Sequence, residues 1–130
     1  VTEVIKQSMF LGSIICIPDP AALAEAGAEA LADPHAAQSG LFPLRAAALL
    51  QGLAPERAAG RLSGLLIGAE LAAARDFWQD GPTAIIGAPD LARLYETLLL
   101  AAGAQACHKD GTALVLAGLA AASLDLPEDT

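Results

Sequence analysis

The spacing of apolar residues changes near residue 82, and this change divides the chain into two parts. Before it, apolar positions mostly recur every three or four residues, which is typical of helices with one buried face. After it, short apolar runs of strand length alternate with segments of helix length. At 130 residues the chain has the length of one domain, so we expect a helix-rich α/β domain over residues 1–130. Its mainly helical part is 1–82, and a βαβα unit occupies 83–124.

Proline and aspartate mark the boundaries of the first well-defined helix. Asp19 and Pro20 are the residue types that favour the N-cap and the first helical position, and the helix is expected to reach Ala32. Asp33-Pro34 then closes it, because proline disfavours a helical residue before it. Upstream of this helix we expect a short helix at 2–11 and a β-prone run at 13–17.

Two further helices are expected, each entered at a proline. Proline is tolerated in the first turn of a helix, where its missing N–H has no intrahelical partner. A polar loop at 35–40 should therefore lead to a helix from Pro43 to about Leu53. Pro55 should open the longest helix, which covers 56–78.

Glycines recur every fourth residue in this longest helix, at Gly60, Gly64 and Gly68. Residues four apart share one face of a helix, so these glycines form a groove without side chains. Each glycine costs a helix about 0.8–1 kcal/mol relative to alanine, which implies a packing or binding purpose. Another backbone or a flat ligand can approach closely there, and we predict Gly64 and Gly68 as contact positions. Charged residues interrupt the helix and disfavour a membrane dimer.

The second part of the chain has the pattern of a parallel strand pair joined by a helix. Such a crossover is expected to be right-handed. Gly87-Ala88 lies where the first strand passes into a helix, which is where open α/β sheets bind nucleotides. Gly87 and Ala88 are therefore candidate nucleotide-binding residues. The expected elements are a strand at 83–86, a helix at 89–102 followed by a glycine cap at Gly103, a strand at 104–107 and a helix at 112–124.

Reactive side chains gather in Cys107-His108-Lys109-Asp110, but neighbours on a strand point to opposite faces. This disfavours a metal or nucleophile site, and we name no metal-ligating residue. Asp110-Gly111-Thr112 resembles the Asp-Gly-Thr cluster of some phosphate loops, yet a cap on the last helix explains it as well. Asp90 is open to two interpretations, a favourable charge at a helix N-terminus or a ribose contact.

Glu70 and Arg75 lie in the long helix among small residues. Pairing along the helix and contact with a ligand are both compatible with their spacing. We assign no catalytic residue to this chain.

Charge and composition exclude several classes of partner. The formal net charge is −8 and the seven Lys and Arg residues are scattered, which argues against a nucleic-acid partner. The longest charge-free run, 111–124, is shorter than the roughly 20 residues of a membrane span, so no membrane partner is expected. Cys16 and Cys107 lie far apart without disulfide or zinc spacing, which fits a reducing cytoplasm.

Four segments occur in an order that resembles the C-terminal portion of the 2-keto-3-deoxygalactonate kinase (2-dehydro-3-deoxygalactonokinase) family. The beginning of the chain resembles the family more loosely, and the family's glycine between Thr2 and Glu3 is missing. The segments that carry the resemblance are Leu41–Arg45, Leu62–Glu70, Ile85–Pro89 with Tyr95, and Leu116–Leu119.

This resemblance implies a fold and an activity. The family belongs to the superfamily of sugar kinases, heat-shock protein 70 and actin, in which two RNase H-like lobes close over ATP and the acceptor. It implies transfer of the ATP γ-phosphate to 2-keto-3-deoxygalactonate, in galactonate catabolism, with Mg²⁺. By analogy Gly87 and Ala88 would line the adenosine pocket, with the Gly64–Glu70 helix face nearby.

The same resemblance implies that the chain is a truncated C-terminal lobe. The phosphate loops and the catalytic acid would lie in the N-terminal lobe, upstream of Val1, so the fragment alone is expected to be inactive. Two other readings stay open: a noncatalytic helical module that packs on a partner through the glycine-striped helix, and a small nucleotide-binding regulator. A homo-oligomer is also left open by the sequence.

Overall fold

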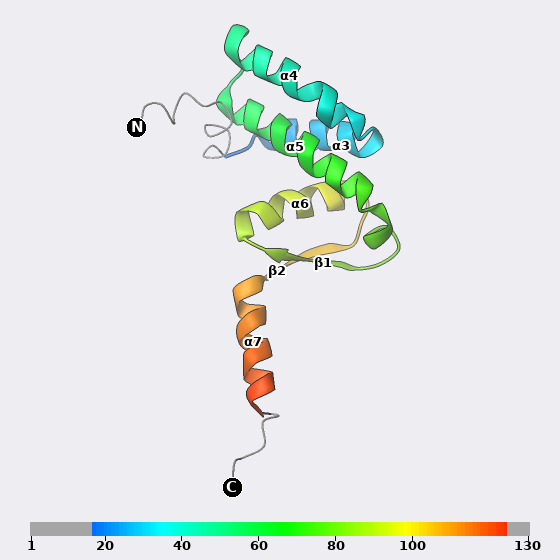
Figure 1. Ribbon diagram of the computed structural model, residues 1–130, viewed down its shortest axis with the longest axis vertical. Coiled ribbons are helices and arrows are strands. Elements are labelled where there is room, and N and C mark those ends of the chain that lie inside the picture. Colours follow the sequence, from blue (N-terminus) through cyan, green and yellow to red (C-terminus); the bar gives the residue numbers. More distant parts are fainter. Residues whose placement is uncertain (1–16, 125–130) are drawn as a thin grey trace, which may run out of the picture.

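The computed structural model describes residues 17–124, which form five α-helices, one 3₁₀ helix and two strands (Figure 1). The helix expected at 2–11 lies outside the described residues, as does most of the strand expected at 13–17. The chain order is α3 (Pro20–Ala32), α4 (His35–Leu50), α5 (Pro55–Ala73), the 3₁₀ helix η1 (Arg75–Phe77), β1 (Thr83–Gly87), α6 (Pro89–Ala101), β2 (Ala106–Asp110) and α7 (Gly111–Leu124).

Helix α3 has the boundaries that its capping residues predict. The Asp19 side chain accepts a hydrogen bond of 2.7 Å from the backbone N–H of Ala22, and Pro20 occupies the first helical position. Local residue types therefore fix this N-terminus without help from the rest of the fold. The buried face of α3 lies against α5 (Figure 1).

Helix α4 corrects the expectation of a polar loop at 35–40 and a helix entered at Pro43. It begins at His35, whose N–H donates 3.0 Å to Asp33 Oδ1, and it ends at Leu50 with Pro43 in its interior. The first turn buries two alanines against a small core cluster on α3 and α5. This burial outweighs the local cost of Pro43, which cannot donate a hydrogen bond within the helix. The cluster comprises Ala26, Ala30, Ala36, Ala37 and Leu65.

Helix α5 is shorter than the expected 56–78. It ends at Ala73, and the chain continues in the 3₁₀ turn η1 up to Trp78. The Trp78 indole N–H donates 2.8 Å to the carbonyl of Leu71, so this buried side chain folds back on the last turn of the helix. The aromatic residue therefore stabilises the helix end from outside it.

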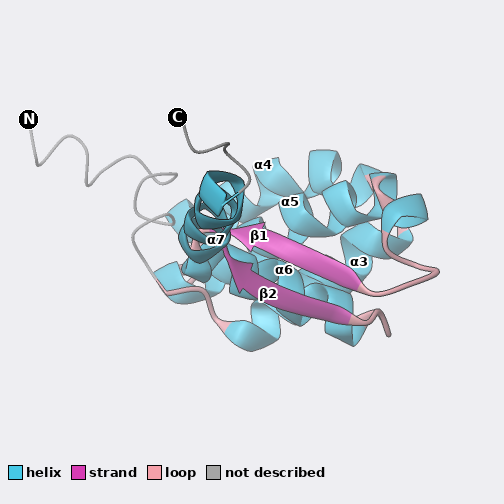
Figure 2. Cartoon of the chain, turned by 90° about the horizontal axis from the view of Figure 1, so that it is seen from below, coloured by secondary structure: helices cyan, strands magenta, loops and turns pink. Residues whose placement is uncertain are grey.

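The two strands form a parallel pair, as expected, with Thr83 opposite Ala106 and Gly87 opposite Asp110. β1 covers the expected residues, whereas β2 begins two residues later than expected. Helix α6 covers one face of the pair, where Ile85 and Ala106 pack against the main core (Figure 2). On the other face Ile86 is 62% exposed. The main core consists of Leu23, Ile67, Leu71, Trp78, Leu98 and Leu99.

Helix α7 extends away from the rest of the structure (Figure 1). It carries no charged side chain, and Val115, Leu116 and Leu119 are each more than 60% exposed. Its start confirms the capping interpretation of Asp110, whose Oδ1 accepts 2.8 Å from the N–H of Ala113. Among residues 17–124, no helix combines the length and apolarity that crossing a membrane requires.

Candidate functional site

The turn Gly87-Ala88-Pro89 connects the carboxyl end of β1 to the N-terminus of α6 and is fully on the surface. Ala88 is the N-cap residue, with φ −60° and ψ 133°, and its side chain has no capping group. The first N–H groups of α6 are therefore not capped by their own N-cap side chain. Such groups at a strand-to-helix turn are suited to contact an anionic or polar ligand.

Gly87 does not need the left-handed backbone conformation that only glycine readily adopts. Within the described residues, positive φ occurs at Gly52 and at Gly103, the predicted helix cap. A Cβ added to Gly87 would meet nothing within 4 Å. The turn therefore presents an open surface with very little side-chain bulk.

The end of β2 lies beside this turn because the strands are parallel. The His108 Nε2 atom lies 3.4 Å from the carbonyl oxygen of Gly87, and the His108 backbone N–H donates 3.1 Å to Glu96 Oε1 on α6. Asp110 is opposite Gly87 in the register and caps α7. From the sequence, His108 was noted only as one of four adjacent reactive residues, and its contact with Gly87 was not predicted. Its neighbour Cys107 is exposed on the opposite face of the strand.

A second contact fixes α6 against α5. The Tyr95 hydroxyl donates a hydrogen bond to Glu70 Oε2. Burial, together with this bond and the carboxylate charge, raises the pKa of Tyr95 to about 12. Glu70 thus pairs across helices, not with Arg75, which donates 3.1 Å to the carbonyl of Leu31 and lies over the Trp78 ring. The ion pair between Glu70 and Arg75 that their spacing allowed is therefore not formed.

The glycine groove of α5 is occupied by α3. A Cβ added to Gly64 would lie 2.5 Å from the carbonyl oxygen of Leu23, and one added to Gly68 would lie 2.5 Å from that of Gly27. The sequence left two possibilities for this groove, close approach of another backbone or of a flat ligand. In the structure the backbone of α3 fills it. The groove is also covered within the chain, so it offers no free face to a partner helix.

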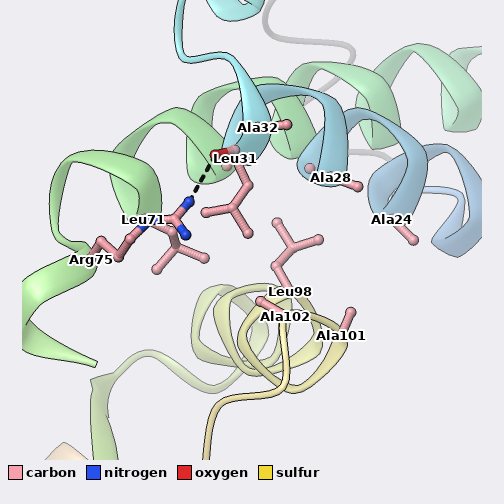
Figure 3. A pocket seen from close by; sticks show the side chains of 11 residues that line it. Ala24, Ala28, Leu31, Ala32, Leu71, Arg75, Leu98, Ala101 and Ala102 are labelled. Carbon is pink, nitrogen blue, oxygen red and sulfur yellow. Dashed lines mark hydrogen bonds between the residues drawn. The ribbon is translucent and has the colours of Figure 1, made fainter. Parts of the chain in front are cut away.

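A cavity lies at the other end of α6 from the Gly87-Ala88 turn (Figure 3). It measures about 330 Å³ and lies between α3, α5 and α6, with alanine and leucine walls. Arg75 is its one charged lining residue, and its guanidinium is turned to the carbonyl of Leu31. Leu31 belongs to the last turn of α3, where the helix dipole favours a cation.

Within residues 17–124 there is no group of three or more His, Cys, Asp or Glu side chains arranged to hold a metal ion. Asp90 in the first turn of α6 lies 3.6 Å from Arg93 and is fully exposed. Of the other polar groups near the turn, Asp110 caps α7 and Glu96 accepts from the backbone N–H of His108.

Comparison with known proteins identifies one family. The family model described as 2-keto-3-deoxy-galactonokinase matches residues 3–122, nearly the whole chain. Searches of curated proteins and of solved structures found no match.

Proposed function

This chain belongs to the 2-keto-3-deoxy-galactonokinase family, and from this membership we propose that it forms the C-terminal part of a sugar-acid kinase. The complete enzyme would transfer the γ-phosphate of ATP to 2-keto-3-deoxygalactonate. The single observation that carries this proposal is the family match over residues 3–122. The geometry of the Gly87-Ala88 turn supports a more specific role for this chain.

In that role the Gly87-Ala88 turn contributes part of the adenosine site. It lies at the carboxyl ends of two parallel strands, the edge at which open α/β sheets bind ligands. Its exposed backbone and small side chains leave room for a purine or a ribose. We propose that Gly64 and Gly68 contribute to this site indirectly. Their close contact with α3 fixes the position of α5, and the hydrogen bond from Tyr95 to Glu70 fixes α6 against α5.

The fit of the expected cofactors to these residues is uneven. The Gly87-Ala88 turn fits the nucleoside part of ATP, which would supply the phosphoryl group. Residues 17–124 contain no group of three or more His, Cys, Asp or Glu side chains that could hold a metal ion by themselves. We therefore assign no metal ligand and no catalytic residue to this chain, and we propose that these groups belong to the N-terminal lobe.

We further propose that the strands and helices of this chain are part of an RNase H-like lobe. The sheet has two strands and an exposed face, and α7 leaves its apolar side chains uncovered, as expected of a lobe that packs on further elements of the same enzyme. The partners are then ATP, the sugar acid and the N-terminal lobe, in the cytoplasm. Self-association of the complete kinase is compatible with the same surfaces.

The variant Ala88→Leu in the complete kinase tests the adenosine role. A leucine there would occupy the space proposed for the nucleoside, so we expect a higher KM for ATP and little change in the KM for the sugar acid. Ala54→Leu is the matched control, because Ala54 is also an exposed N-cap alanine before a proline, with φ −56° and ψ 138°. An unchanged KM for ATP in folded Ala88→Leu enzyme would place the adenosine site elsewhere.

A further inference from the structure

His108 links the three elements that meet at the Gly87-Ala88 turn. It belongs to β2, its ring nitrogen Nε2 lies 3.4 Å from the carbonyl oxygen of Gly87 at the end of β1, and its backbone N–H is bound by Glu96 of α6. Its side chain is half-buried, on the α6 face of the strand pair. No other histidine lies on the described strands.

The contact of His108 with Gly87 involves the carbonyl of one peptide group. The carbonyl of Gly87 and the N–H of Ala88 belong to the same planar trans peptide, so they point in opposite directions. A carbonyl turned to His108 therefore turns the Ala88 N–H away from the imidazole. The orientation of this peptide sets the surface that the turn presents to a ligand.

We propose that His108 is a positioning residue for the adenosine site, which holds the Gly87-Ala88 peptide in its binding orientation. This inference rests on the proposed function of the turn. His108 acts through the backbone of Gly87 and takes no part in the phosphoryl transfer. Glu96 supports it by fixing the backbone of His108 itself.

The hydrogen bond to the Gly87 carbonyl requires a hydrogen on Nε2 of His108. Nε2 carries a hydrogen in one neutral tautomer and in the imidazolium ion, and each of these can donate to the Gly87 carbonyl. Because His108 acts through the backbone of Gly87 and transfers no proton, we expect the same ionisations in the pH profile of kcat for the parent and for His108→Ala. A group that transferred a proton would instead add an ionisation to that profile.

The test compares His108→Ala and His108→Gln in the complete kinase. Alanine removes the donor, whereas the glutamine amide can place a nitrogen close to the position of Nε2. We expect His108→Ala to raise the KM for ATP about two- to tenfold, the range of one lost hydrogen bond, with kcat and the KM for the sugar acid nearly constant. His108→Gln should recover most of the lost affinity. Cys107→Ala, on the opposite face of the same strand, is the control and should equal the parent.

Two outcomes would overturn the positioning role. One is an unchanged KM for ATP in folded His108→Ala enzyme, and the other is a lost ionisation in its pH profile of kcat. Ala88→Leu, measured in parallel, separates this failure from that of the proposed function. If Ala88→Leu raises the KM for ATP and His108→Ala does not, the adenosine site stands and the positioning role fails. If neither variant changes it, both fail.

Discussion

Gly64 of α5 lies so close to α3 that a Cβ atom at this position would be 2.5 Å from the carbonyl oxygen of Leu23. One turn later, Gly68 has the same relation to the carbonyl of Gly27. The pairs advance in the same direction along both helices, so α3 and α5 run parallel and meet backbone to backbone. The close contact explains why α5 keeps glycines that weaken it as an isolated helix.

We expect Gly64→Ala to lower the free energy of unfolding by about 1–3 kcal/mol, because backbone atoms of α3 would have to move to admit the methyl group. Urea unfolding followed by circular dichroism measures the change. Gly118→Ala is the control, since a Cβ at Gly118 in α7 would meet nothing within 4 Å. That substitution should be neutral or stabilising by up to about 1 kcal/mol. Equal effects of the two substitutions would mean that α3 does not pack on the glycine face in solution.

Tyr95 is the one tyrosine of the chain, so its ionisation can be followed directly by ultraviolet absorbance. Burial and the Glu70 carboxylate raise its pKa to about 12, above the value of about 10 for an unfolded tyrosine. The folded state thus favours the neutral phenol. This contribution to stability is complete below pH 10 and is lost as the pH rises towards 12.

Glu70→Gln should lower the pKa of Tyr95 but leave it above 10, because burial remains. Tyr95→Phe should remove the dependence of stability on pH between 10 and 12 that this residue causes. A parent pKa near 10 in the absorbance titration would show that the contact between α5 and α6 is not formed.

Local signals in the sequence predicted the elements whose boundaries depend on one or two residues. Asp19 and Pro20 fix the start of α3, Gly103 ends α6 with a φ of +84°, and Asp110 caps α7. Each of these depends on backbone geometry within a few residues. The parallel strand pair also followed from the alternation of apolar runs and helices.

Contacts between distant segments could not be predicted in the same way. The start of α4 depends on alanines buried against α3 and α5, and this outweighs the boundary signal of Pro43. The bond between Tyr95 and Glu70 joins residues 25 positions apart. In the candidate site, the sequence located the Gly87-Ala88 turn but not the contact of His108 with it, because the strand register that unites them is a tertiary property.

Pro43 lies inside α4, where it lacks an N–H for the helical hydrogen bond. We expect Pro43→Ala to stabilise the chain by up to about 3 kcal/mol, the difference between proline and alanine in a helix interior. Thermal unfolding measures the change. Ala47→Gly, at a half-buried position one turn later, should be destabilising by about 1 kcal/mol if the helix continues through this region. A loss of stability in Pro43→Ala would show that α4 requires a bend at the proline.

The isolated chain should not phosphorylate 2-keto-3-deoxygalactonate. Phosphoryl transfer requires groups that hold the phosphates and the metal ion and a group that orients the acceptor hydroxyl. Residues 17–124 contain the open turn that we propose for the nucleoside, but no group of three or more His, Cys, Asp or Glu side chains that could hold a metal ion by themselves. We expect ADP release in a coupled assay from the complete kinase and none above background from the chain, even when circular dichroism shows the chain to be folded.

The chain should also bind ATP weakly or not at all, because a nucleoside contact alone is a small part of the interaction. Turnover by the chain itself would show that it contains its own phosphate and acceptor groups, and the assignment of catalysis to the N-terminal lobe would be wrong.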